Sequence, residues 1–184
     1  MYPFLRLGWQ FVRHRNDPAL GLLDTHESRH LCWPWDLDPW LELNNGRTLT
    51  LYDLGRLPLG RRAGLLRVLR AHRWGLTVAG SSVRYRRRVR AFETVTMRSR
   101  ALGWDDRFLY IEQAMFKRSG EAASHVLIRS AITGPDGIVP PQRLAAALGH
   151  DGLPPPLPGW VAAWVQADAT RPWPPMQADP DAVT

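Results

Sequence analysis

Carboxylates and amides gather where an extended segment of the chain gives way to a helical pattern. Asp36 and Asp38 end the extended segment, and Asn44 and Asn45 open the helical one. The first turn of a helix has unpaired backbone N–H groups and a partial positive charge, so it can hold a developing oxyanion. A carboxylate beside such donors can attack a carbonyl or activate water to attack it. These residue types, in this order, indicate an acyl-transfer or hydrolytic site.

The helix that would carry these donors is expected to begin near Asn44, a residue type suited to capping. Gly55 and Pro58 are expected to interrupt it, and a second helix is expected over 60–72. A short helix is predicted over 141–148, since proline stands at its start and glycine after its end. The first helix needs an apolar side toward a sheet, and we expect this side to consist of Leu49, Leu51, Tyr52 and Leu54.

Strand-like patterns occupy most of the remaining chain between residues 26 and 133. Five runs have this character: 26–35, 76–90, 92–104, 107–118 and 122–133. Tight turns join the last three, which predicts an antiparallel meander, and apolar residues on both faces of the last two predict central strands. The order indicates an α+β class in which one long helix lies across one curved antiparallel sheet.

Composition sets further limits on the function. The chain has 184 residues, 45% of them hydrophobic, enough for one core, and a formal net charge of +7 that favours an anionic partner. That partner could be nucleic acid, an acidic membrane surface or a phosphorylated substrate. No apolar run reaches the roughly 18 residues of a membrane span, and residues 1–13 lack the pattern of a signal peptide. With Cys32 as the single cysteine, we expect a cytoplasmic protein without a membrane span.

Other motifs point to less specific chemistry. Ser81 and Ser82 lack the Gly-x-Ser-x-Gly setting of a hydrolase nucleophile. His26 and His30 are too far apart along a strand to chelate a metal easily, and no metal site is expected. The arginines of residues 84–90 alternate along a predicted strand, as on a solvated sheet face or a phosphate-binding surface. No nucleic-acid motif accompanies them, so nucleic acid is not an expected partner.

The chain resembles the hotdog-fold acyl-CoA thioesterases of the 4-hydroxybenzoyl-CoA thioesterase type in the spacing of Asp38, Asn44, Asn45, Arg47, Asp53 and Arg56. Residues 81–87 are similar to the strand after the helix in that family, and residues 103–106 and 134–141 resemble a thioesterase-like subgroup. The resemblance implies a hotdog fold, a curved antiparallel sheet wrapped around one long central helix. We expect this domain over residues 28–150, after an N-terminal lead-in (1–27) and before an extended, proline-rich tail (151–184).

The same resemblance implies a reaction, the hydrolysis of an acyl-CoA thioester to a free acid and coenzyme A. It assigns Asp38 as nucleophile or general base and the Asn45 N–H as the donor that polarises the thioester carbonyl. Asn44 accompanies Asn45 at the helix start, and Asp53 could position water. A tunnel between helix and sheet would hold the acyl chain.

The resemblance also implies partners. Coenzyme A enters as part of the substrate, and no other cofactor is implied. Its phosphates are expected on surface arginines, for which Arg86, Arg87 and Arg88 are the candidates. The implied assembly is a homodimer, and pairing of dimers into tetramers is left open.

Three positions depart from the family pattern. Leu41 and Glu42 stand where the family has Gly-His, and Thr48 replaces an aromatic residue at the helix start. A second carboxylate near Asp38 could share its proton and change its charge state. These replacements favour an alternative hypothesis, a non-catalytic hotdog module that binds an acyl or coenzyme A ligand or a protein partner.

Overall fold

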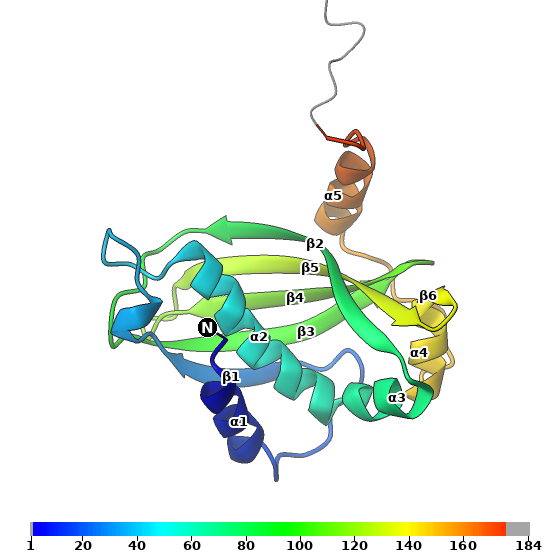
Figure 1. Ribbon diagram of the computed structural model, residues 1–184, viewed down its shortest axis with the longest axis horizontal. Coiled ribbons are helices and arrows are strands. Elements are labelled where there is room, and N and C mark those ends of the chain that lie inside the picture. Colours follow the sequence, from blue (N-terminus) through cyan, green and yellow to red (C-terminus); the bar gives the residue numbers. More distant parts are fainter. Residues whose placement is uncertain (1, 176–184) are drawn as a thin grey trace, which may run out of the picture.

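The computed structural model describes residues 2–175 and forms one curved antiparallel sheet crossed by a long helix (Figure 1). The predicted α+β class and the meander of consecutive strands are confirmed. The spatial order of the strands is β1 (His26–Leu31), β3 (Thr94–Trp104), β4 (Phe108–Phe116), β5 (Ala122–Gly134) and β2 (Gly75–Tyr85), with β6 (Gly137–Val139) beside the end of β5.

Strand β2 ends earlier than the sequence pattern predicts. The run over 76–90 was expected to be one strand with its arginines on one face, but the strand stops at Tyr85. Directly afterwards, the N–H groups of Arg86 and Arg87 both donate to the carbonyl of Ala123, at 2.8 and 3.0 Å. This shared acceptor breaks the ladder with β5, so residues 86–90 form a loop rather than a sheet face.

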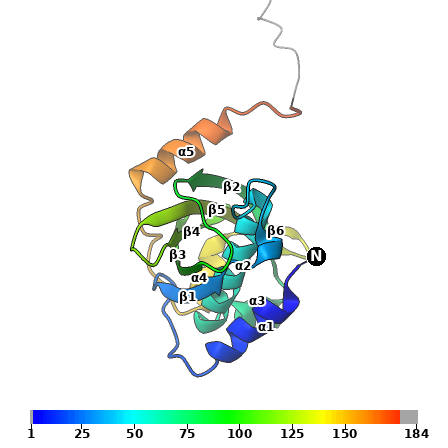
Figure 2. The ribbon, with the colours of Figure 1, turned by 90° about the vertical axis from the view of Figure 1, so that its left-hand side faces the viewer.

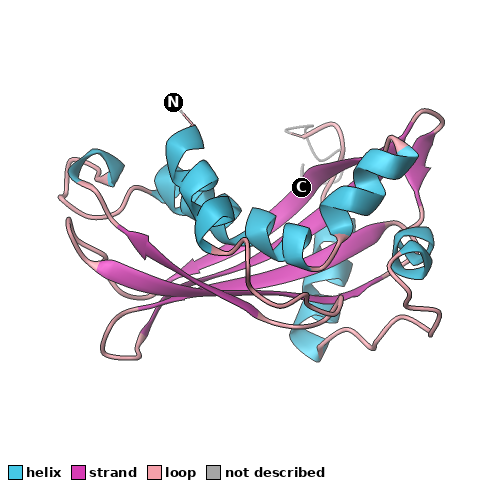
Figure 3. Ribbon diagram, turned by 90° about the horizontal axis from the view of Figure 1, so that it is seen from below, coloured by secondary structure: helices cyan, strands magenta, loops and turns pink. Residues whose placement is uncertain are grey.

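Helix α2 (Asn45–Arg62) is the central helix, and Figure 3 shows it on one side of the sheet. The predicted interruption at Gly55 and Pro58 is wrong, because both residues are buried and the helix passes through them. Gly55 lies so close to β3 that a β-carbon there would collide with the sulfur of Met97. The helix is therefore held by its packing on the sheet despite a proline that lacks an N–H donor.

The buried side of α2 differs from the expected one at a single position. Leu51, Tyr52 and Leu54 are buried as predicted, whereas Leu49 is 37% exposed. The inner core beneath the helix includes the fully buried Met97 and Met115 of β3 and β4.

Shorter helices surround this core. Helices α1 (Phe4–Arg13) and α3 (Leu65–His72) lie on the same side of the sheet as α2 (Figure 1), and a single 3₁₀ turn, η1, spans Pro34–Asp36. The short helix predicted over 141–148 is confirmed as α4 (Pro141–Ala147). No helix within residues 2–175 is long and apolar enough to cross a membrane.

The predicted tail contains a helix, so the expectation of an extended segment is wrong there. Helix α5 (Gly159–Ala169) lies on the opposite side of the sheet from α2 (Figure 2). Its Val161 and Trp164 pack with Tyr110 and Leu127 in a second, outer core. Residues 176–184 of the predicted tail lie outside the described residues.

Candidate functional site

A cleft of about 200 Å³ opens at the N-terminus of α2. Its walls come from the first turn of the helix, the loop after β2 and the start of β5. The lining residues are Glu42, Leu43, Asn45, Thr48, Tyr85, Arg86, Arg87, Arg88, Val89 and Ser124. Of the residues predicted from the sequence, Asn45 and the three arginines therefore meet here, while Asp38, Asn44 and Asp53 are not among the lining residues.

The start of α2 is capped as predicted. The side-chain oxygen of Asn44 accepts hydrogen bonds from the N–H groups of Gly46 and Arg47, at 2.8 and 3.2 Å. The Thr48 N–H donates to the Asn44 carbonyl at 2.8 Å. Among residues 2–175, the Asn45 N–H is then the donor of this first turn that has no acceptor, and Asn45 lines the cleft. It offers a hydrogen bond to an oxygen atom bound there.

The loop of residues 86–90, which we call the arginine loop, forms the positive wall of the cleft. Arg87 pairs with Glu121 at 2.9 Å, and Arg88 pairs with Glu42 at 2.9 Å. Arg86 has no carboxylate partner within the described part of the chain. The loop therefore presents at least one uncommitted guanidinium to an anion, and guanidinium groups bind phosphate oxygens in bidentate geometry.

The carboxylate of Asp38 is occupied by its own turn. Its Oδ1 accepts hydrogen bonds from the N–H groups of Trp40 and Glu42, at 2.9 and 3.3 Å. The Asp38 N–H in turn donates to the Glu42 carbonyl at 2.8 Å, and Leu41 takes a left-handed backbone with φ of 58°. Asp38 thereby stabilises the turn that places Glu42 in the wall of the cleft.

Glu42 is the carboxylate that lines the cleft. Its side chain is about one-third exposed and is held by the Arg88 guanidinium. In the sequence, Glu42 stands out only as a departure from a family pattern. Its distance of four residues from Asp38 was the available signal, because a turn of that length brings its two ends together.

Asp36, the other carboxylate of the motif, is buried and structural. It pairs with Arg6 of α1 at 2.7 Å and with Arg47 of α2 at 3.4 Å, and it accepts the Trp33 N–H at 3.1 Å. Its carbonyl accepts the Asn44 N–H at 2.9 Å. These contacts fix the approach of the chain to the start of α2, and the one from Arg6 spans thirty residues of sequence.

Asp53 lies farther along α2, in an ion pair with Arg56. Burial raises the pKa of the Asp53 carboxyl, and the Arg56 guanidinium counteracts this effect. Arg56 also donates to the side-chain oxygen of Gln113 at 3.3 Å, and Gln113 donates to the Tyr52 carbonyl at 2.8 Å. This polar network ties the helix to β4.

Ser124, one of the residues that line the cleft, contacts the buried Tyr52. Their hydroxyl oxygens lie 2.8 Å apart, and Tyr52 is 0% exposed. Burial raises the pKa of the Tyr52 hydroxyl, so the group remains a neutral hydrogen-bonding partner. The side chains beneath this pair, between helix and sheet, are buried, and Leu51, Met97 and Met115 are among them.

The remaining candidate groups are buried. Cys32 is fully buried, and burial raises the pKa of its thiol to about 11. His30 shares a hydrogen bond of 2.8 Å with Ser28, and His26 one of 2.9 Å with Arg62. Among residues 2–175, no group of three His, Cys, Asp or Glu side chains could hold a metal ion.

Known proteins resemble this chain in sequence or in fold. The family model of the thioesterase-like superfamily matches residues 32–165. The protein named THEM6 of Xenopus laevis is 33% identical over 140 residues, 74% of this chain and 68% of that protein. Its namesake in Danio rerio is 32% identical over 93 residues, 50% of this chain and 46% of that protein.

Solved structures resemble the fold at much lower sequence identity. A DHNA-CoA thioesterase from Staphylococcus aureus aligns with a TM-score of 0.59 and 13% identity over 79% of this chain and 91% of its own. Slr0204, a 1,4-dihydroxy-2-naphthoyl-CoA thioesterase from Synechocystis, aligns with a TM-score of 0.60 and 8% identity over 70% of this chain and 97% of its own. The hotdog fold predicted from the sequence is thereby confirmed.

Proposed function

The chain belongs to the thioesterase-like superfamily, and from this premise we propose that it hydrolyses acyl-CoA thioesters in the cleft at the start of α2. The observation that carries the proposal is the convergence of an unpaired helix N–H, a carboxylate and an arginine loop on one cleft. The 4-hydroxybenzoyl-CoA thioesterase type, suggested by the spacing around Asp38, is the subgroup we favour.

The Asn45 N–H is the proposed oxyanion donor. As water adds to the thioester carbonyl carbon, negative charge develops on the carbonyl oxygen. A hydrogen bond from Asn45 and the positive end of the α2 dipole stabilise this charge more than they stabilise the neutral ground state. The donor needs no rearrangement, because Asn44 already holds the neighbouring N–H groups in place.

A carboxylate would remove the proton from the attacking water. Asp38 has this role by resemblance to the family, and Glu42 by its position in the wall of the cleft. We favour Glu42 as the base and Asp38 as the residue that shapes its turn, since both N–H contacts of Asp38 lie within that turn. Collapse of the tetrahedral intermediate breaks the carbon–sulfur bond, and the departing thiolate takes up the proton.

The arginine loop would bind the anionic part of coenzyme A. Glu42 is paired with Arg88 at 2.9 Å. A phosphate that engages Arg88 competes for this guanidinium and releases Glu42 to act on water. Substrate binding and activation of the base are thereby coupled.

The size of the cleft restricts the acyl group. A volume of about 200 Å³ is below the roughly 300–1,000 Å³ typical of ligand pockets, and the Tyr52–Ser124 contact prevents extension into the core. The proposed substrates therefore carry a short or compact acyl group.

A second candidate function is binding without turnover. The observation that favours it is that Asp38 and Glu42 both have partners, so that no idle carboxylate faces the cleft. Such a module would hold an acyl or coenzyme A ligand in the same cleft.

One experiment separates the two functions. The protein is mixed with a panel of acyl-CoAs, and released thiol and thermal stabilisation are both measured. Thiol release above the uncatalysed rate supports hydrolysis. Stabilisation without thiol release supports the binding module, because a ligand that binds only the folded state raises the melting temperature. Neither effect with any acyl-CoA contradicts both.

A homodimer is the proposed assembly, on the strength of the family resemblance, and a further pairing into tetramers is the alternative. Strand β2 has no strand partner on its outer edge among the described residues, so a second copy could extend the sheet there. Analytical ultracentrifugation at micromolar concentration distinguishes monomer, dimer and tetramer by mass.

A further inference from the structure

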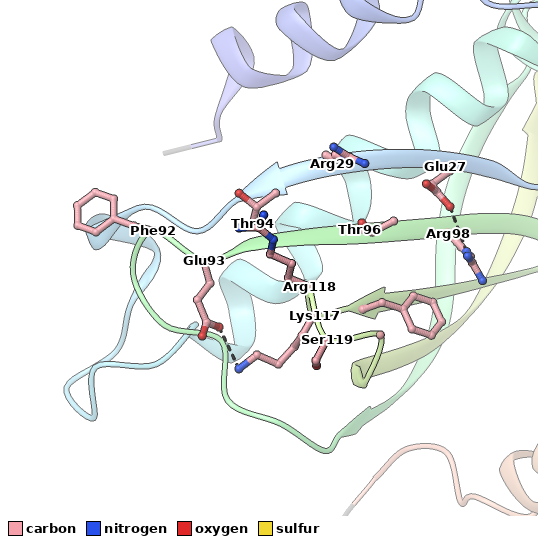
Figure 4. Close-up of a pocket in the computed structure, with 12 residues that line it drawn as sticks. Glu27, Arg29, Phe92, Glu93, Thr94, Thr96, Arg98, Lys117, Arg118 and Ser119 are labelled. Carbon is pink, nitrogen blue, oxygen red and sulfur yellow. Dashed lines mark hydrogen bonds and ion pairs between the residues drawn. The ribbon is translucent and has the colours of Figure 1, made fainter.

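A large hollow of the described surface lies on the outer face of the sheet, away from the cleft. It has a volume of about 950 Å³ and lies over β1, β3 and the turn between β4 and β5, on the half of this face that α5 leaves uncovered (Figure 4). Its polar lining includes the hydroxyl groups of Thr94, Thr96 and Ser119. We call it the outer groove.

Positive charge is in excess in the outer groove. Four cationic and two acidic side chains line it. Both acids are neutralised: Glu27 pairs with Arg98 at 3.2 Å, and Glu93 pairs with Lys117 at 3.1 Å.

The other two cations, Arg29 and Arg118, have no ion-pair partner within residues 2–175. Figure 4 shows the Arg118 side chain extended toward Thr94 of β3, and Arg29 lies on the adjacent strand β1. Two uncommitted guanidinium groups beside hydroxyl donors suit a doubly charged phosphate or pyrophosphate.

An aromatic ring stands at one end of the groove, on a strained backbone. Phe92 has a φ of 63°, a left-handed conformation that is rare for an aromatic residue, and its side chain is 65% exposed. The conformation is fixed by the Phe92 N–H donating to the Cys32 carbonyl at 2.7 Å and the Cys32 N–H donating to the Glu93 carbonyl at 2.9 Å. A strained, exposed ring gains nothing for folding, but it offers a flat face for stacking.

We propose that the outer groove binds a nucleotide, with its phosphates on Arg29 and Arg118 and its base against Phe92. The charge excess selects an anion, the pair of arginines selects a phosphate over a single carboxylate, and the ring selects a ligand with an aromatic base. Together these features fit a nucleotide better than inorganic phosphate alone.

The outer groove is connected to the cleft. Lys117, in the groove, donates to the carbonyl of Arg88, in the loop that lines the cleft, at 2.8 Å. The nucleotide can therefore have two sources: the adenosine bisphosphate end of a coenzyme A whose acyl end lies in the cleft, or a separate free nucleotide. The first source rests on the proposed thioesterase function, and the second does not.

Binding is tested first with adenosine 3′,5′-bisphosphate and pyrophosphate, by isothermal titration calorimetry at low ionic strength. Both probes are expected to bind, and Arg29→Gln and Arg118→Gln are each expected to weaken binding about tenfold. Arg100→Gln is the matched control, since Arg100 lies on the same strand as Arg98 but outside the groove and pairs with Glu112. Absence of binding, or equal affinity in all three variants, overturns the proposal.

The role of the ring is tested with Phe92→Asn. Asparagine tolerates the left-handed backbone, so this variant is expected to remove the ring while preserving the fold. The affinity for adenosine bisphosphate should decrease to that for pyrophosphate, whereas pyrophosphate binding should not change. An unchanged preference for the nucleotide shows that the base does not contact Phe92 and overturns its proposed placement.

The source of the nucleotide is identified by competition, without any need for turnover. Displacement of bound adenosine bisphosphate by coenzyme A, with no displacement by pantetheine, supports the coenzyme A tail as the occupant. Simultaneous binding of adenosine bisphosphate and coenzyme A supports a separate nucleotide. If thiol release fails with every acyl-CoA, the proposed function fails, while the calorimetric result for the groove remains informative.

Discussion

The hydroxyl group of Tyr52 on α2 lies 2.8 Å from that of Ser124 on β5, and Ser124 lines the cleft. Tyr52 comes from the middle of the helix and Ser124 from the beginning of a strand 72 residues later. The contact lies between a small cleft, in which Asn45 offers its N–H, and the buried apolar core beneath α2. The proposed substrate range depends on this contact.

The first prediction concerns acyl length. The wild-type protein is expected to hydrolyse short acyl-CoAs and to lose activity steeply as the chain lengthens. Tyr52→Leu removes the ring and should shift the optimum to longer chains, at a stability cost on the order of 2–4 kcal/mol for the lost packing. Specificity constants across a series of chain lengths provide the measurement.

Tyr52→Phe is the control for this shift. It removes the hydroxyl group but keeps the ring, and the lost hydrogen bond should cost about 1 kcal/mol. Its chain-length profile should match the wild type. A wild-type protein that prefers long acyl chains would contradict the proposal that the Tyr52–Ser124 contact limits the length of the acyl group.

The second prediction separates the two carboxylates. An amide at position 38 can still accept the N–H groups of Trp40 and Glu42, so Asp38→Asn is expected to preserve the turn and to lower kcat by less than about threefold. Glu42→Gln removes the charge that lines the cleft and should lower kcat by about 10²–10⁴-fold. Thiol release under saturating substrate measures both.

The reverse ranking, with Asp38→Asn inactive and Glu42→Gln active, would assign the base to Asp38. Circular dichroism of both variants verifies that the fold is unchanged.

The third prediction concerns the arginine loop. Arg86→Gln is expected to raise KM for acyl-CoA by on the order of 3–10-fold, because the phosphates lose a charged partner. KM for the corresponding acyl-pantetheine, which has no phosphate ester, should not change. Arg84→Gln removes the same charge from an exposed position two residues away that does not line the cleft, and it should leave both values unaltered. An equal rise for both substrates would mean that Arg86 supports the fold of the loop rather than the anion.

The fourth prediction is a loss of stability in mild acid. Burial lowers the pKa of His26 to about 4 and that of His30 to about 3, from an ordinary value of 6.5. Between the folded and unfolded pKa values, these histidines are therefore protonated in the unfolded chain but neutral in the folded chain. The contribution of each histidine is complete above about pH 6.5 and is lost as the pH decreases toward the folded pKa, at up to about 1.4 kcal/mol per pH unit.

Urea unfolding between pH 7.5 and pH 4 measures this slope. His30→Gln should flatten it, whereas His72→Gln, at an exposed position, should leave it unchanged. A slope that is the same in all three proteins would indicate that other groups govern acid unfolding.

Local signals made much of the sheet and the start of α2 predictable. Alternating side chains and tight turns identified β3, β4 and β5, and Asn44 marked the helix start through its own capping chemistry. The Asn45 donor and the arginines of the cleft were expected from the family resemblance rather than from a local signal.

Long-range packing was not predictable from these signals. The continuity of α2 through Gly55 and Pro58 depends on the close approach to Met97, more than forty residues away in sequence. The role of Asp36 depends on Arg6, and the strand after α2 ends early because Ala123 captures two N–H groups. Prolines on either side concealed the helical character of α5, whose place is set by the outer core.

The two edge strands of the sheet, β1 and β2, differ in how far their backbone groups are free to pair with another chain. Along β1, side chains of α1 already occupy outward carbonyls: Arg6 binds that of Leu31 at 2.7 Å, and Gln10 binds that of Arg29 at 3.2 Å. Along β2, no other strand takes the corresponding place within residues 2–175. Since only one margin is receptive, strand-to-strand growth would end after a single symmetric partner instead of propagating into a fibre.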